Sequence, residues 1–240
     1  MFRPKIFSSI LAVSSAAALI AIGTAAPAGA VTSGSVAGYV AAPSASPTQS
    51  VSDEFVVPSI NCAKVGSGGF QAVVLGVRLQ IPGGNSAGGA ALVCPGTVAT
   101  YVPIIQINGS SISSGLTIHP GDTVSTTLSE GPSGTTVKVT DGAQSQTASG
   151  PGGSASSDAV GDFAANCSTS GCSPVPIARV TPFSDASIDG HNLFNAHSRE
   201  QYLTDAAGAT EMQGGPWTTK SFNSFNVRWI MSCSTGPGIC

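Results

Sequence analysis

The stretch TVSTTLSEGPSGTTVKVTDGAQSQTA, residues 123–148, decides the fold class. It holds three short runs in which β-branched or apolar residues alternate with polar ones: Thr123–Leu128, Thr135–Asp141 and Gln144–Ala148. Alternation with a period of two is typical of half-buried β-strands. The turn residues Gly131–Gly134 and Asp141-Gly142 separate the runs, and Asp-Gly favours the positive φ of a tight hairpin. The stretch therefore predicts consecutive antiparallel strands.

The same pattern continues in both directions, and helical periodicity is nearly absent. Further strands are expected at Ser35–Val40, Val51–Val57, Phe70–Gln80, Ala90–Cys94, Ala99–Ile107, Pro176–Thr181, Gln201–Asp205 and Phe225–Met231. Asp185–Ser198 is polar and is expected to be a loop. No linker followed by a change in composition divides the chain. We predict an all-β, single-domain antiparallel β-sandwich of two packed, bent sheets, similar to concanavalin or jelly-roll folds.

The N-terminus, residues 1–30, has the pattern of a secretory signal peptide. Arg3 and Lys5 precede an apolar run, and Ala28-Gly29-Ala30 offers a small-residue cleavage site. We therefore expect export, cleavage near Ala30 and a mature domain at residues 31–240. No later apolar segment is long enough for a membrane-spanning helix.

Charge argues against two classes of partner. The 240-residue chain has 9 Lys and Arg against 12 Asp and Glu. Without Arg3 and Lys5 the net charge is about −5, which disfavours nucleic acid and anionic membranes as partners. Charged residues make up only 9% of the chain, which suits a protein of the extracellular medium. We expect a secreted monomer.

The six cysteines, all after residue 30, indicate three disulfides in an exported chain. Six cysteines allow fifteen pairings, and the sequence does not choose between them. Proximity favours Cys167–Cys172 and Cys233–Cys240, which leaves Cys62–Cys94. Paired C-x-x-C motifs are absent, so we expect no zinc site and no other metal.

Six segments, in order, resemble the glutamic peptidases (eqolisins), particularly the bacterial secreted type. They are Val36–Val40 (VAGYV), Glu54–Cys62 (EFVVPSINC), Ile118–Val124 (IHPGDTV), Ser156–Asp162 (SSDAVGD), Val175–Ala186 (VPIARVTPFSDA) and Ser224–Trp229 (SFNVRW). The resemblance covers nearly all of the mature chain. It implies two bent antiparallel sheets with a substrate cleft on the concave face, and a Glu–Gln pair that activates water at acidic pH.

The two catalytic positions implied by the resemblance hold other residues. The family glutamate falls on Asp158, in the run Asp158–Asp162, and the family glutamine falls on Cys94. Asp has a shorter arm than Glu, and a displacement of about 1 Å can cost on the order of a hundredfold in rate. Losing one oxyanion donor costs about 10²–10³. Cys94 offers no amide and is expected to be structural. Gln106, on the strand face opposite Ile105 and Ile107, is a speculative substitute amide.

Two other constellations are weaker. Gly84–Gly88 (GNSAG) matches G-x-S-x-G, but no helix follows it, so a hairpin loop is expected instead of a nucleophile elbow. Asp185, Asp189, His191 and His197 could gather a metal, but the sequence predicts no helix or strand to hold them, and a polar loop is favoured. No cofactor is expected.

Two functions follow from these observations. The first is a degenerate, non-catalytic relative of glutamic endopeptidases that uses the cleft to bind a polypeptide or for a structural purpose. The second is an acid endopeptidase in which Asp158, or Asp162, activates water with a substitute amide such as Gln106. The first is preferred because both catalytic positions are substituted.

Overall fold

The computed structural model describes residues 31–33, 37–41, 49–64, 71–81, 84–152, 157–160, 164–165, 167–168, 171–172, 180–204, 210–215, 218 and 221–229. Within these ranges the chain is almost wholly β, and a single 3₁₀ turn, η1 (Cys62–Lys64), is the only helical element. The predicted all-β class is confirmed. No helix in this part of the chain is long and apolar enough to cross a membrane.

The strands form one hydrogen-bonded path that folds over into two layers. One half of the path runs β10 (Gln144–Gly150), β9 (Gly134–Asp141), β8 (Thr123–Gly131), β3 (Ser50–Val56), β15 (Val180–Ile188), β18 (Phe225–Trp229) and β17 (Thr210–Gly214). The other half runs β16 (Ser198–Thr204), β2 (Gly38–Ala41), β11 (Ser157–Val160), β4 (Gln71–Ile81), β5 (Gly84–Cys94), β6 (Thr100–Ile107) and β7 (Ser110–Ser111).

Four short strands lie beside this path. β1 (Val31–Ser33) pairs in parallel with β16, and β12 (Ala164–Ala165) pairs with β4. β13 (Cys167–Ser168) and β14 (Gly171–Cys172) form a separate hairpin. The strand pairings along the described path are antiparallel, as expected for a sandwich.

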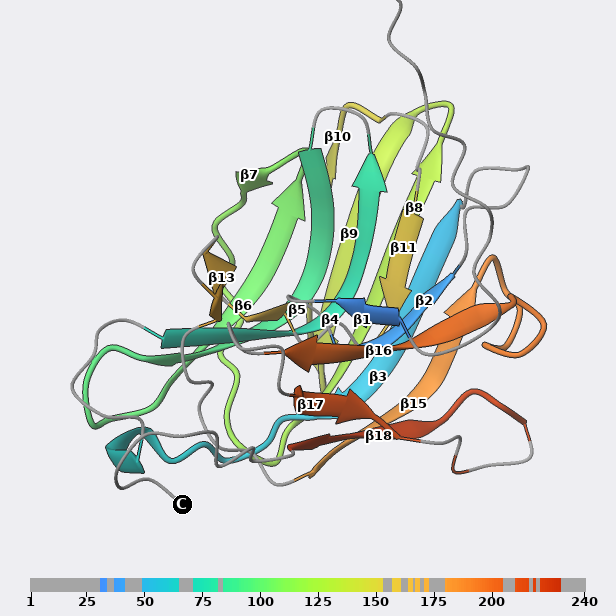
Figure 1. The fold of residues 1–240 in the computed structure, drawn as a ribbon. Helices are drawn as coiled ribbons and strands as arrows, with labels where there is room; N and C mark the ends of the chain where they lie inside the picture. The colour runs from blue at the N-terminus through green and yellow to red at the C-terminus, as the bar shows by residue number, and fades with distance from the viewer. Residues whose placement is uncertain are drawn as a thin grey trace, which may run out of the picture.

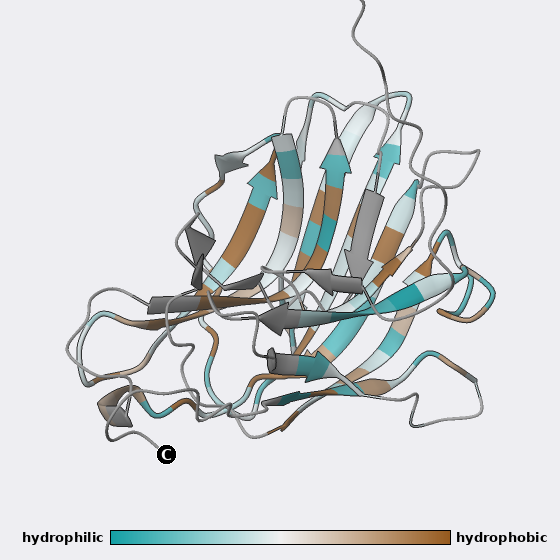
Figure 2. Ribbon diagram, in the orientation of Figure 1, coloured by the Kyte–Doolittle hydropathy of each residue, from teal (hydrophilic) through white to brown (hydrophobic). Residues whose placement is uncertain are grey.

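The two halves pack face to face, with β4, β5 and β6 in front of β8 and β9 in Figure 1. The strands of both layers alternate hydrophobic and hydrophilic residues, which Figure 2 shows as interleaved brown and teal segments. In β4 the side chains of Val73, Leu75, Val77 and Leu79 are buried between the layers. The residues between them therefore face away from the core, on what we call the outer face of the sheet.

Four aromatic rings form the centre of the other end of the core. Phe55, Phe183 and Phe225 are register partners on β3, β15 and β18. The rings of Phe183 and Phe225 stack with centroids 5.1 Å apart, and Tyr39 of β2 meets Phe225 edge-on at 4.8 Å. The Tyr39 hydroxyl donates to the carbonyl of Gly215 at 2.8 Å, so its polar end is satisfied within the core. These rings connect the two halves of the strand path.

A line of glycines crosses the β2–β4–β5 region. Gly76 and Gly89 are register partners with φ of 141° and 145°, and Gly38 in β2 has φ of 142°. Val160 of β11 is opposite both Tyr39 and Val77. Gly38 and Gly76 directly precede these two residues in their strands, so they occupy matching positions. Figure 1 shows β4 and β5 turning sharply midway along their length. Gly76 and Gly89 are the middle residues of these two strands. Glycine is required because these backbone conformations are strained for any residue with a Cβ.

The strand predictions differ from the structure in three respects. β5 begins at Gly84 and not at Ala90, so Gly84–Gly88 is strand, not the expected hairpin loop, and Ser86 is fully buried. The small residues there hide the alternation: a Cβ on Gly88 would come within 2.6 Å of the Thr126 side chain. β15 continues to Ile188, into the expected Asp185–Ser198 loop. β17, β11 and the short strands β1, β7, β12, β13 and β14 were not predicted. Residues 176–179 lie outside the described ranges.

We predict that Gly89→Ala destabilises the protein by at least about 3 kcal/mol. An added Cβ would lie 1.8 Å from the carbonyl oxygen of Leu75, which is backbone and has no rotamer to move. Urea denaturation measures the effect. Gly96→Ala is the control, because a Cβ there meets nothing within 4 Å, and it is expected to change stability by no more than about 0.5 kcal/mol. Equal effects of the two substitutions would contradict the role of the glycine pair.

Candidate functional site

The sequence directs attention to β11, which lies between β2 and β4. In the register, Asp158 is opposite Leu79 of β4 and Ala41 of β2, and both of these partners are buried core residues. The next residue, Ala159, is opposite Arg78 and Val40. Asp162 lies outside the described residues, as does the side chain of Asp158, so only the backbone position of Asp158 is known.

Gln106, the speculative substitute amide, lies on β6 opposite Ala87 of β5, which is in turn opposite Arg78. Its Nε2 donates to the carbonyl of Gly109 at 3.0 Å. The register rows of Gln106 and Asp158 are therefore adjacent rows of the same sheet. Adjacent rows alternate between the two faces of a sheet, so the register does not bring these two positions to one face.

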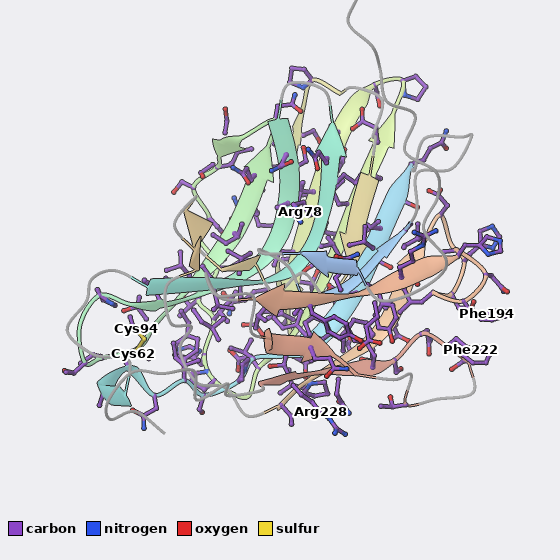
Figure 3. The ribbon with its side chains drawn as sticks, in the orientation of Figure 1. Cys62, Arg78, Cys94, Phe194, Phe222 and Arg228 are labelled. Atoms are coloured by element: carbon purple, nitrogen blue, oxygen red, sulfur yellow. A yellow bond between two sulfur atoms is a disulfide. The ribbon has the colours of Figure 1, made fainter. Side chains whose placement is uncertain are left out.

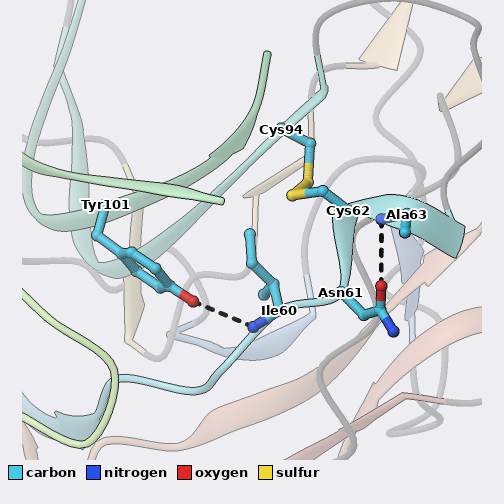
Figure 4. Close-up of a disulfide and its surroundings, with 6 residues drawn as sticks. All are labelled: Ile60, Asn61, Cys62, Ala63, Cys94 and Tyr101. Carbon is cyan, nitrogen blue, oxygen red and sulfur yellow. Dashed lines mark hydrogen bonds between the residues drawn. A yellow bond between two sulfur atoms is a disulfide. The ribbon is translucent and has the colours of Figure 1, made fainter. Parts of the chain in front are cut away.

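Cys94 forms a disulfide with Cys62, the pair that remained once proximity had favoured the other two. Figure 4 shows this bond joining the end of β5 to the turn η1, beside two hydrogen bonds that hold the turn. The hydroxyl of Tyr101 accepts from the Ile60 amide at 3.1 Å, and Asn61 Oδ1 accepts from the Ala63 amide at 3.1 Å. A bonded sulfur offers neither an amide nor a thiol, so Cys94 has a structural role.

The other predicted disulfides are not determined by the described residues. Cys167 and Cys172 occupy opposite register positions in the β13–β14 hairpin. Cys233 and Cys240 lie outside the described ranges, as do the side chains of Cys167 and Cys172. Both pairings stay predictions.

One register row on the outer face crosses six strands and holds two arginines and one glutamine. We call it the arginine row; it consists of Gln106, Ala87, Arg78, Ala159, Val40 and Arg199. Arg78 and Arg199 are both partly exposed. The strands β2, β4, β5 and β6 contain no Asp or Glu, whereas β11, between β2 and β4, contains Asp158.

A carboxyl–carboxamide contact that the sequence analysis missed lies between β16 and β17. Gln213 Nε2 donates to Glu200 Oε1 at 3.2 Å, and Tyr202 also hydrogen-bonds to this carboxylate. Burial raises the pKa of Glu200, although the hydrogen bonds from Gln213 and Tyr202 oppose the rise. Glu200 follows Arg199 along β16 and so faces the opposite side of the sheet. Sequence reasoning missed this contact because β17 was not predicted.

Asp189, one of the residues weighed as metal ligands, holds backbone amides instead. Asp189 Oδ1 accepts hydrogen bonds from the amides of Gln49 and Ser50, at 2.7 and 2.8 Å. His191 closes a bridge with Ile188 through its backbone. Among the described residues, no three His, Cys, Asp or Glu side chains gather as a metal site would require. Asp189 thus anchors the start of β3 to the turn after β15.

Comparison with solved structures finds one fold in common. The crystal structure of Scytalido-glutamic peptidase with a peptide-based transition state analog superposes with a TM-score of 0.61 at 15% sequence identity. The match covers 83% of this chain and all of that one. No family model matches the sequence, and no curated protein matches it significantly. The chain therefore has a glutamic-peptidase-like fold, in agreement with the resemblance seen in six sequence segments.

We predict that removing the Cys62–Cys94 disulfide, by the double substitution of both residues with Ser, destabilises the protein by about 3–4 kcal/mol. The reason is that the bond closes a loop across a sequence separation of 32, which limits the entropy of the unfolded chain. Urea midpoints of the variant and the wild type, both without reductant, measure the loss. An unchanged midpoint would contradict the prediction.

We also predict that Glu200→Gln stabilises the protein at pH 7 but not at pH 3. A carboxyl with a raised pKa in the folded state contributes stability that is fully present below the unfolded pKa and is lost as the pH rises through the folded pKa. The variant does not titrate and avoids that loss. The expected gain in Tm at pH 7 is about 1–2 °C, small because the carboxyl is only partly buried. Parallel Tm profiles for variant and wild type from pH 3 to 7 would contradict this prediction.

Proposed function

We propose that this protein is an exported, non-catalytic relative of glutamic endopeptidases that binds a polypeptide on the outer face of β4, β5 and β6. Export rests on the signal-like residues 1–30, with the mature chain beginning at Val31. The Cys62–Cys94 disulfide is compatible with an oxidising compartment.

The observation that carries the proposal is the composition of the outer face. Water activation needs a carboxylate within hydrogen-bond reach of the water and an amide or similar donor beside it. β4, β5 and β6 contain no Asp or Glu, and Cys94 is held in a disulfide. A carboxylate for this face would have to come from another strand.

Asp158 is the candidate for that carboxylate, and the register argues against it. Its backbone position is level with the core residue Leu79, whereas Gln106 is level with Arg78 on the outer face. The alternative function, an acid endopeptidase that uses Asp158 or Asp162, requires both groups to reach one water molecule. The observed register is unfavourable for Asp158 with Gln106.

The binding part of the proposal draws on the structural neighbour. That protein was solved with a peptide-based transition state analog, so a protein with this fold can hold a peptide-like ligand. Peptide binding and peptide cleavage depend on different groups, because hydrogen bonds and packing position a chain whereas only the water-activating groups cleave it. A face that has lost those groups can still bind.

We predict that the purified chain from Val31 to Cys240 does not cleave a denatured protein at pH 2–5. Mass spectrometry of the substrate after long incubation measures cleavage, with Asp158→Ala as the matched variant. Wild type and variant are expected to give the same background. Cleavage by the wild type that disappears in Asp158→Ala would overturn the proposal and favour the acid endopeptidase.

A further inference from the structure

We propose that residues 112–122 form a strap that closes the open side of the sandwich, and that a proton shared between Asp122 and Asp141 holds this strap in place at acidic pH. The inference goes beyond the proposed function, because it concerns how the fold responds to pH and not what the outer face binds. It follows from the path of the chain between β7 and β8, the contacts at both ends of the strap and the chemistry of two neighbouring carboxyl groups.

The strand path leaves one side of the sandwich open. Its two ends in the described part of the chain, β10 and β7, do not pair with each other. The strands β6, β9 and β10 still pack against one another there, although no ladder joins β6 to β9 or β10 among the described residues. A Cβ on Gly150 of β10 would lie 2.9 Å from the side chain of Ile107 on β6. Side-chain packing therefore joins the two halves on this side.

The strap crosses this side in an extended form without being a strand. It starts against β6, where the amide of Ile112 donates to the carbonyl of Ile105 at 2.8 Å. Burial then alternates along the chain: Leu116 and Ile118 are buried in the main core, and the residues on either side of each are exposed. The strap thus covers the core with alternate side chains but lacks the ladder that holds a strand in place.

Gln146 of β10 holds the first half of the strap. Its Oε1 accepts hydrogen bonds from the hydroxyl of Ser114 and the amide of Gly115, both at 2.9 Å. Its Nε2 donates to the carbonyl of Ser113 at 3.0 Å. One side chain therefore makes three hydrogen bonds to the strap, and they do not depend on pH because a carboxamide does not titrate.

Asp122 holds the second half. Its Oδ2 accepts from the amide of His119 at 2.6 Å and lies 3.4 Å from His119 Nδ1. Its carbonyl accepts from the amide of Val57 at 2.9 Å, and the amide of Gly121 donates to the carbonyl of Val57 at 2.8 Å. The Asp122 side chain also hydrogen-bonds to the side chain of Asp141, the last residue of β9. The strap, the end of β3 and the end of β9 therefore meet at Asp122.

The contact between the two carboxyl groups requires a proton. An ionised carboxylate only accepts hydrogen bonds, so Asp122 and Asp141 bond to each other only while one of them is protonated. Burial raises the pKa of Asp141, and the charge of Asp122 and the hydrogen bond to it also raise this pKa, whereas His119 lowers it. The stabilisation is therefore complete below the ordinary pKa of Asp, about 4, and is lost as the pH rises through the pKa of the folded state. Above that pH the two carboxylates repel each other.

The turn at residues 119–122 supplies the charges that act on Asp141. In the register, Asp141 is level with the apolar residues Val124 of β8 and Phe55 of β3. The neighbouring strand β10 contains no ionisable residue. The ionisable residues on the other strands around this point all lie in other register rows: Asp53 and Glu54 on β3, Glu130 on β8, Lys138 on β9 and Tyr101 on β6.

The test is hydrogen–deuterium exchange with mass spectrometry at about pH 3.5 and about pH 7, with labelling times scaled to the intrinsic exchange rate at each pH. Peptides within residues 112–122 report on the strap, and peptides from β8 and β9 report on the sandwich beneath it. In the wild type we expect the protection of residues 117–122 to be about fivefold lower at pH 7, a modest change because both carboxyl groups are partly exposed. The protection of β8 and β9 should change by less than about twofold.

Asp141→Asn is the main variant, because its amide donates to the Asp122 carboxylate without a proton from solution. We expect it to keep at pH 7 the strap protection that the wild type has at pH 3.5. Asp122→Asn should also remove the pH difference, and it replaces the first variant if that one does not fold. Gln146→Ala should lower the protection of residues 113–116 by about tenfold at both pH values, since it removes three hydrogen bonds and no charge.

Asp185→Asn is the matched control. Asp185 is an exposed aspartate whose Oδ1 accepts from Asn223 Nδ2 at 3.4 Å, and asparagine tolerates its positive φ. Asn223 directly follows Phe222, which Figure 3 places at the right-hand side of the molecule, whereas β7 and the start of the strap lie at the left in Figure 1. This variant removes a negative charge far from the strap and should leave the pH difference within about 1.5-fold of the wild type.

Four outcomes overturn the inference. They are equal strap protection at the two pH values in the wild type, an unchanged pH difference in Asp141→Asn, loss of the difference in Asp185→Asn, and a parallel change in all peptides, which would indicate global unfolding instead of release of the strap. Far-ultraviolet circular dichroism and Tm at both pH values check that each variant is folded.

Discussion

The close approach of Gly76 and Gly89 is the constraint on which the rest of this structure depends. The two strands meet there with backbone so near that a Cβ on either residue would lie within 2.0 Å of a carbonyl oxygen on the other strand. Side chains cannot enter such a contact, so it locates the turn midway along β4 and β5. The arginine row begins immediately beside it, because Arg78 and Ala87 are the next outward positions along each strand. The geometry of the outer face therefore derives from a local backbone requirement.

Sequence patterns predicted much of the fold, and the exceptions have physical reasons. The hairpins from β8 to β10 were predicted because each strand has a β-branched face and the turns contain Gly, Pro or Asp-Gly. The strand predicted for β5 began too late because the residues before Ala90 are mostly small and buried on both faces. Their burial therefore shows no period of two. The strand predicted for β15 ended too early. The pairing of β15 with β3 shifts in register between Ser184 and Ser187, where Asp185 has a positive φ, and this shift breaks the alternation in the sequence.

The candidate site was less predictable than the fold. Resemblance in order and phase identified the β11 segment, but the face on which a residue lies depends on the register with β4, and a shift of one residue exchanges the two faces. For Asp158 the register comes from the structure, in which Leu79 and Ala41 are its partners on the two neighbouring strands. The Glu200–Gln213 contact was missed for a related reason, since it joins strands across a hairpin whose second strand has no clear pattern. The pairing of Cys94 with Cys62 was predicted because proximity favoured pairing the other four cysteines with one another.

The scaffold and the chemistry of this fold are separable. The aromatic rings around Phe183 and the Cys62–Cys94 disulfide hold the sandwich together without side chains on the outer face of β4, β5 and β6. Exposed positions on that face can therefore change at little cost in stability, unlike the Gly76–Gly89 pair. β4, β5 and β6 contain no Asp or Glu, so a carboxylate that activates water on this face would have to come from another strand, and β11 with Asp158 is the neighbouring candidate. The register places the Asp158 backbone level with the core residue Leu79, one row away from Gln106. A shift of one residue in the register of β11 would bring Asp158 to the face of Gln106, so the choice between the two functions depends on one strand and not on the scaffold.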